Sequence, residues 1–215
     1  MRSSTRLLVA FVALIAILAS SVQSAALDAD AAFPKDTVAV SFEAAFVRFG
    51  GRLSSGSSTV QAFNVSPRLS LLPFNVLHFH SLSGRLDGAL EFGIEPTYQY
   101  FNTQHRNFAG LGLVLKYYLT GLSYGPFVPW IDASIAPGWT DLNIGRVLEE
   151  TRLSGPFMNL IQAGPGVSYF FSERGSIYLG LRAQHMSNAG LNRANHNYSM
   201  NTAEGVVIGM TWFIR

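Results

Sequence analysis

Residues 110–119, GLGLVLKYYL, alternate between two kinds of side chain. One face of this stretch carries large, mostly apolar side chains: Leu111, Leu113, Leu115, Tyr117 and Leu119. The other face carries small or polar ones: Gly110, Gly112, Val114, Lys116 and Tyr118. Successive side chains of a β-strand point to opposite faces of the sheet. The stretch therefore predicts a strand with one apolar face and one face of small and polar residues.

The same alternation recurs along the chain in runs separated by Gly, Ser, Asn and Pro clusters, which is typical of strands joined by turns. The runs lie at 38–49, 58–72, 87–101, 106–120, 126–140, 157–171, 174–188 and 203–215. Eight tilted strands of about ten residues are the usual minimum for a transmembrane barrel. We therefore predict an all-β protein: an eight-stranded antiparallel β-barrel over residues 27–215, with a short mobile lead at 27–37.

A soluble β-sandwich would also alternate, so two further features decide between the two architectures. Charges on the polar faces are interspersed with glycines, as expected where small and large side chains share a narrow lumen. Aromatic residues gather near the ends of the runs, as in the girdles of membrane barrels. We predict an outer-membrane barrel and retain a periplasmic sandwich as the alternative. The polar-face charges are expected to form a hydrogen-bonded plug rather than a pore lining or proton path: Glu91, Glu95, Lys116, Asp132 and Arg182.

The composition fits an exported membrane protein. Residues 1–26 combine a basic start, a short apolar run and small residues, so we predict a signal peptide cleaved between Ser24 and Leu27, with an uncleaved anchor as the alternative. The chain of 215 residues is 13% charged and 48% hydrophobic and has no cysteine, which excludes disulfides and thiol chemistry. A net charge of +2 gives no support for nucleic-acid binding. The predicted location is the outer membrane of a Gram-negative bacterium.

The run 174–188 ends with a histidine and a serine on its apolar face. His185 and Ser187 continue the outward row that begins at Ile177, and side chains two apart on a strand point the same way. They are either ordinary interface residues or a base and nucleophile, because a histidine can take the proton of a serine hydroxyl. His78 and His80 have the same spacing but no third ligand nearby. We therefore expect no metal site and no cofactor.

The stretch His185-Met186-Ser187-Asn188-Ala189-Gly190-Leu191, which precedes an asparagine-rich turn and one last strand, resembles the motif of the PagL-type lipid A 3-O-deacylases. These enzymes are part of the acyloxyacyl hydrolase family. The resemblance implies an outer-membrane esterase that removes the 3-O-linked acyl chain of lipid A, with lipopolysaccharide and outer-membrane lipid as its partners. It implies Ser187 as nucleophile, His185 as general base, Asn188 and the Gly190 amide as oxyanion hole, and Asn195 as a supporting residue.

The third member of the triad departs from the family pattern. The family places a glutamate fourteen residues after the histidine, where this chain has Ser199. If the turn is two residues longer, the supporting asparagine is Asn197 and the matching position is Asn201. Glu204 is the nearest carboxylate and is the candidate acid, with Asn201 as an alternative neutral orienter. A catalytically impaired family member with a structural or lipid-binding role is therefore the alternative function. The oligomeric state is open, and a homodimer is compatible with the sequence.

Overall fold

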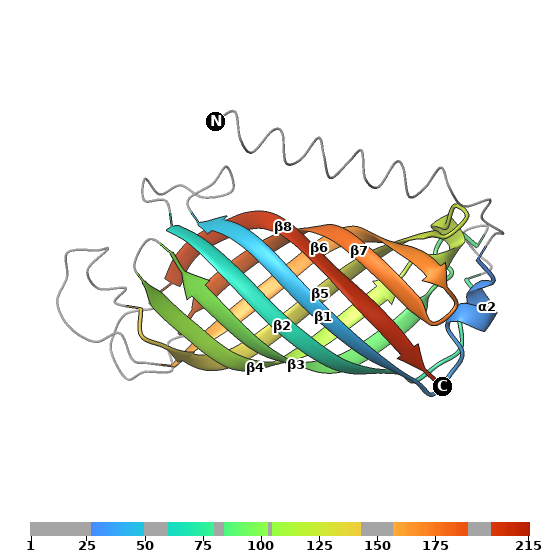
Figure 1. The fold of residues 1–215 in the computed structure, drawn as a ribbon, viewed down its shortest axis with the longest axis horizontal. Coiled ribbons are helices and arrows are strands. Elements are labelled where there is room, and N and C mark those ends of the chain that lie inside the picture. Colours follow the sequence, from blue (N-terminus) through green and yellow to red (C-terminus); the bar gives the residue numbers. More distant parts are fainter. Residues whose placement is uncertain (1–26, 50–59, 80–83, 103–104, 143–156, 189–198) are drawn as a thin grey trace, which may run out of the picture.

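A computed structural model describes residues 27–49, 60–79, 84–102, 105–142, 157–188 and 199–215, with side chains left out at 199–201. Eight strands form one closed antiparallel barrel in which each strand pairs with the next and the last pairs with the first (Figure 1). The strands are β1 (Thr37–Phe49), β2 (Val60–Leu72), β3 (Ala89–Phe101), β4 (Arg106–Tyr118), β5 (Phe127–Thr140), β6 (Phe157–Ser172), β7 (Gly175–Ser187) and β8 (Ser199–Ile214). The predicted fold is confirmed.

Seven of the predicted strands begin and end within two residues of the observed ones. The exception is β8, which begins at Ser199 rather than at residue 203. Ser199 and Met200 pair with Ser187 and Met186 after a shift of register, so the start of β8 follows the end of β7. Alternation in the sequence could not reveal this extension, because pairing with β7 and not amphipathicity holds it in the sheet.

A network of buried ion pairs occupies the barrel lumen. Arg182 contacts Asp132 and Glu43 at 2.7 Å each, and Arg68 contacts Glu95 at 2.6 Å. All five side chains are at least 94% buried. Buried charges are stable only when they are paired and hydrogen-bonded. The predicted plug is therefore confirmed, and Glu43 and Arg68 from the first two strands extend it.

Glycines give the lumen room for its largest side chain. Trp130 is 1% exposed, and a Cβ added at Gly166 would lie 2.1 Å from its ring. A Cβ at Gly180 would lie 2.6 Å from the same ring. The ring also faces Lys116, whose Nζ is 4.4 Å from its centroid. Small residues thus alternate with large ones in the interior, as a barrel of this size requires.

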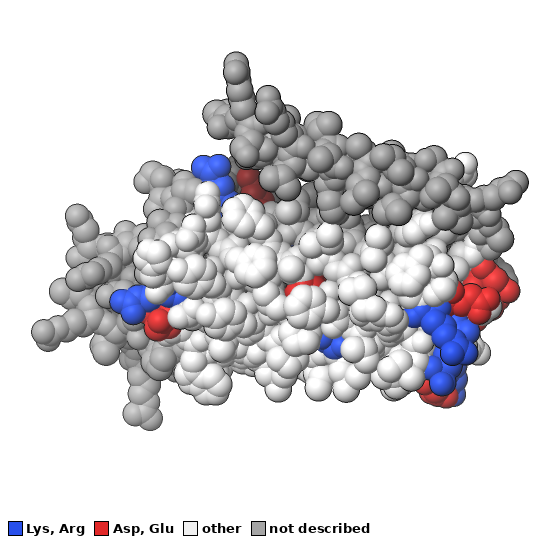
Figure 2. Space-filling model, in the orientation of Figure 1, with Lys and Arg blue, Asp and Glu red and all other residues white. Residues whose placement is uncertain are grey.

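The outer wall is an apolar belt. Its exposed side chains include Phe42, Phe46, Leu69, Phe92, Ile94, Leu113, Ile131 and Leu181. Figure 2 shows the charged side chains gathered mainly at the two ends of the barrel, with little charge on the wall between them. In the part of the chain that the structure describes, no helix is long and apolar enough to cross a membrane. The polar interior and apolar exterior are those of a membrane barrel.

Residues of the lead segment 27–37, for which the sequence predicts mobility, pack against the buried core at one end of the barrel. Residues Ala29–Ala32 form a short helix, α2, capped by Asp28, whose side chain accepts from the Ala31 amide. Phe33 follows it and is fully buried. Figure 1 shows α2 at the same end of the barrel as the C-terminus. Its ring lies 4.7 Å from that of Tyr118, a spacing typical of packed aromatic pairs. Burial of this one large side chain explains why the segment is seated in the barrel.

Candidate active site

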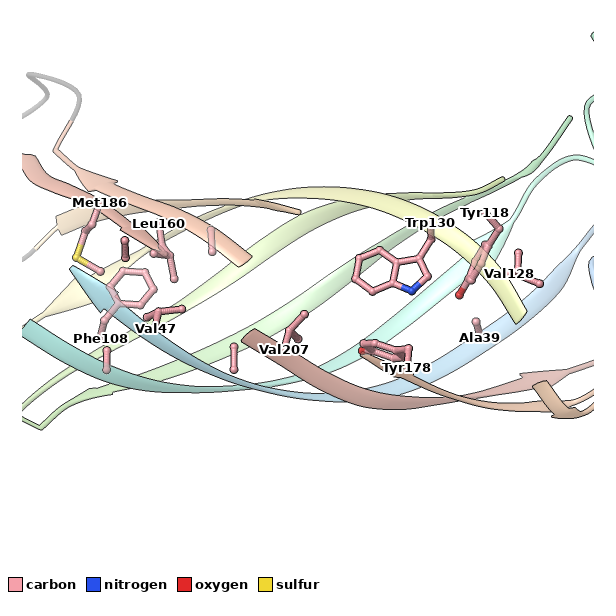
Figure 3. Packing of buried hydrophobic residues seen from close by; sticks show 14 of the residues in the cluster. Ala39, Val47, Phe108, Tyr118, Val128, Trp130, Leu160, Tyr178, Met186 and Val207 are labelled. Carbon is pink, nitrogen blue, oxygen red and sulfur yellow. The ribbon is translucent and has the colours of Figure 1, made fainter. Parts of the chain in front are cut away.

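His185 and Ser187 lie on the outer wall of the barrel, at the C-terminal end of β7. Both side chains are half-buried, and Met186 between them is fully buried in the lumen. Met186 pairs with Leu160 of β6, and Figure 3 shows both side chains inside the barrel near Phe108. Because Met186 points inward, its two neighbours must point outward. The lumen packing therefore fixes the predicted pair on the outer surface.

On the β6 side, the pair faces two outward side chains. His185 is opposite Ile161, which is 42% exposed, and Ser187 is opposite Asn159. Side chains of directly opposed residues have Cβ atoms about 4.5–5.5 Å apart. Asn159 is therefore a neighbour of the Ser187 hydroxyl that sequence reasoning missed. The signal lies in the register between strands, which no single-strand pattern contains.

On the β8 side, the register shifts opposite His185. Gln184 pairs with Ala203 and Met186 with Met200, so β8 has one more residue than β7 across this interval. Asn201 and Thr202 occupy the irregularity. Bulges of this kind are frequent beside active sites, where they change the direction of a side chain. The backbone of Asn201 thus lies beside His185, as an orienting residue would require.

Glu204 lies on the same outer face as the pair. It is opposite Ala183 of β7 and opposite Arg48 of β1. Since Ala183 and His185 are two apart, Glu204 is a diagonal cross-strand neighbour of His185, at about 7–8 Å between backbone positions, within reach of a long side chain. The structure therefore brings the candidate acid to the row next to the histidine. Arg48 is the neighbouring cation on its other side.

The predicted oxyanion and supporting residues are only partly placed. Asn188 follows β7 and is 1% exposed, so its side chain is not presented on the outer wall with Ser187. Its backbone amide directly follows the candidate nucleophile. Gly190, Asn195 and Asn197 lie outside the described residues. Among the described residues, no group of three or more histidine, cysteine, aspartate or glutamate side chains could hold a metal ion.

A closed barrel with an apolar outer wall and a His-x-Ser pair on that wall define a class of protein: an outer-membrane barrel with a candidate site on its outer surface. The family model of lipid A 3-O-deacylase (PagL) matches residues 61–207, and the chain belongs to this family. The match includes β2 to β7 and extends into β8 beyond Glu204. The family assignment and the outer-membrane location are thus confirmed.

Three solved structures are similar to the chain, and the first of them shows the same fold. The crystal structure of the outer membrane enzyme PagL has a TM-score of 0.52 and 17% identity, covering 81% of this chain and 98% of that one. Neisserial surface protein A has a TM-score of 0.49 and 16% identity, covering 81% and 96%. The outer membrane protein OprG from Pseudomonas aeruginosa has a TM-score of 0.41 and 12% identity, covering 84% and 96%. No curated protein sequence matches the chain.

Proposed function

We propose that this protein is an outer-membrane esterase that removes the 3-O-linked acyl chain of lipid A, with Ser187 as nucleophile and His185 as general base. The observation that carries the proposal is the position of this pair on the lipid-facing wall of a lipid A 3-O-deacylase family member. A hydroxyl and an imidazole on that wall would be accessible to the ester bonds of a lipid that remains in the membrane.

The orientation of the barrel supports lipid A as the substrate. The tight turn of Glu173 and Arg174 lies at the same end as the C-terminus, where Arg215 bonds to the Glu173 carbonyl. Short turns are typical of the periplasmic end of outer-membrane barrels. His185 and Ser187 are at the opposite end, which is then the cell exterior. Lipopolysaccharide occupies the outer leaflet there, so its ester bonds and the pair share one level.

The proposed chemistry is acyl transfer in two steps. The Ser187 oxygen attacks the ester carbonyl carbon while its proton moves to His185, and the carbonyl electron pair becomes an oxyanion. The oxyanion collapses, the bond to the sugar oxygen breaks, and His185 returns the proton to that oxygen. Water, activated by His185, then attacks the acyl-serine and releases the fatty acid. Glu204, or Asn201 as a neutral substitute, orients the imidazole.

The test is release of fatty acid by the purified chain in detergent micelles containing lipid A. The wild type should release one hydroxyacyl chain, and Ser187→Ala and His185→Asn should each lose at least about 10³-fold in kcat, as removal of a triad member does in serine hydrolases. Ser66→Ala serves as a matched control, because this serine is buried in the lumen. A folded wild type that releases nothing would favour a structural or lipid-binding barrel.

A further inference from the structure

We propose that Asn159 is a further catalytic residue, which donates a hydrogen bond from its side-chain amide to the oxyanion formed at Ser187. The inference rests on the proposed esterase function. It starts from the register of β6 and β7, in which Asn159 stands directly opposite Ser187. Met158 and Leu160 on either side are buried in the lumen at 1% and 0% exposure, so Asn159 points outward.

The composition of β6 makes this asparagine unusual. The outward row of the strand, every residue of which is described, otherwise holds aromatic and aliphatic side chains: Phe157, Ile161, Ala163, Pro165, Val167, Tyr169 and Phe171. An amide on an apolar wall carries a desolvation cost unless it has a partner. Opposite it on β5 is Pro137, whose ring offers neither a donor nor an acceptor. None of the hydrogen bonds between described residues uses the Asn159 side-chain amide, and an oxyanion at Ser187 would be an acceptor for its N–H groups.

The geometry suits an oxyanion donor. The tetrahedral carbon would be bonded to the Ser187 oxygen, between the side chains of β6 and β7. Donors act when they lie about 2.7–3.1 Å from the oxyanion, and directly opposed Cβ atoms are about 4.5–5.5 Å apart. The Asn159 amide reaches across this gap. Asn188, whose side chain is buried, can supply only its backbone amide to the outer wall, and Asn159 would add a side-chain donor from the neighbouring strand.

The experiment compares three variants of the full-length chain in the micelle assay. Asn159→Ala removes the amide, and Asn159→Asp keeps size and polarity but replaces the donor with a carboxylate. Asn107→Ala is the matched control, since Asn107 is a half-buried residue at the same end of the barrel, on β4, and bonds to Tyr98. Readouts are kcat, KM and the inhibition constant of an alkyl boronic acid, which forms an anionic tetrahedral adduct on serine.

We expect both Asn159 variants to lower kcat by about 10²-fold or more, as loss of one oxyanion donor does, while KM changes less than about threefold. The boronic acid should bind both variants more weakly, and Asn107→Ala should match the wild type. Wild-type kcat in Asn159→Ala or in Asn159→Asp would overturn the assignment, and so would a change in KM alone. If Ser187→Ala retains full activity, or the wild type has none, the proposed function and the assignment both fall. An active wild type that depends on Ser187 but not on Asn159 removes only the assignment.

Discussion

At the scale of single residues, the question is which side chain orients His185. Glu204 of β8 is opposite Ala183, two residues before the histidine, whereas Asn201 lies at the register shift beside the histidine. A carboxylate stabilises the imidazolium by charge, and an amide only holds its orientation. The two candidates therefore make different predictions for the same assay.

We expect Glu204→Gln to lower kcat by as much as about 10⁴-fold, because it keeps the shape of the side chain and removes the charge. Asn201→Ala should then cost less than tenfold. Steady-state kinetics on both variants in micelles distinguishes the roles. Near-normal activity of Glu204→Gln, with a large loss in Asn201→Ala, would show that the neutral residue has taken over orientation.

Arg48 places a positive charge beside the candidate acid Glu204, which the sequence alone could not indicate. It is opposite Glu204 on the exposed wall of β1, so a guanidinium lies on the side of the carboxylate away from His185. The apolar alternation predicted the face and the end of β7 on which the pair lies. The neighbours of that pair on the adjacent strands are Asn159, Glu204 and Arg48. Which residues become neighbours depends on the register between strands, and the register includes the shift near Met186.

At the scale of elements, α2 and Phe33 close the end of the barrel that holds the C-terminus. The Phe33 ring packs against Tyr118, Phe170 and Phe213, with centroids 4.7, 5.3 and 5.7 Å away. The composition of the lead, which is small and acidic, concealed this contact. One aromatic residue in a polar segment gives no periodicity to read.

We expect Phe33→Ala to lower the free energy of unfolding by about 3–5 kcal/mol, the usual cost of emptying a buried aromatic site. Urea unfolding in lipid vesicles, followed by tryptophan fluorescence, measures this. Phe74→Ala is the control, since Phe74 is 50% exposed and its loss leaves no cavity. Equal stability of the two variants would contradict a structural role for the packed lead.

The helix α2 also contacts a histidine, His78. His78 Nδ1 lies 2.9 Å from Asp87, and Nε2 lies 3.7 Å from Asp30 in the first turn of α2. The hydrogen bond to Asp87 raises the pKa of His78 above its usual value of 6.5. The protonated form therefore stabilises the fold fully below about pH 6.5, and this contribution disappears as the pH rises through the folded-state pKa.

The stability lost in His78→Gln should accordingly be larger at pH 5.5 than at pH 9. Nuclear magnetic resonance of the His78 ring should show a titration midpoint above 6.5, the usual pKa of a histidine. Asp87→Asn should move the midpoint of His78 down. An unchanged midpoint in that variant would rule out the hydrogen bond as the cause.

At the scale of the whole molecule, the barrel combines an ion network in its lumen with an apolar outer wall. The five predicted lumen charges could be placed from alternation alone, because a polar residue between outward apolar ones must point inward. Glu43 and Arg68 obey the same rule on β1 and β2. The partners within the network, however, depend on which strands face each other across the lumen.

Removal of one arginine from this network tests its contribution. Arg182→Met leaves the carboxylates of Asp132 and Glu43 without their 2.7 Å partner. Breaking a buried pair in this way costs about 3–5 kcal/mol, and urea unfolding in vesicles should show a loss of that size. Arg174→Met, in the exposed turn between β6 and β7, should leave stability unchanged. A loss of similar size in both variants would exclude the network as the cause.

The measurement that tests the central claim most directly is mass spectrometry of lipid A from a lipopolysaccharide-producing host that expresses this protein or its Ser187→Ala variant. Our account predicts that the wild type removes one hydroxyacyl chain and that the variant leaves lipid A intact, with both proteins folded in the outer membrane. Intact lipid A in both strains, or the same loss in both, would contradict it.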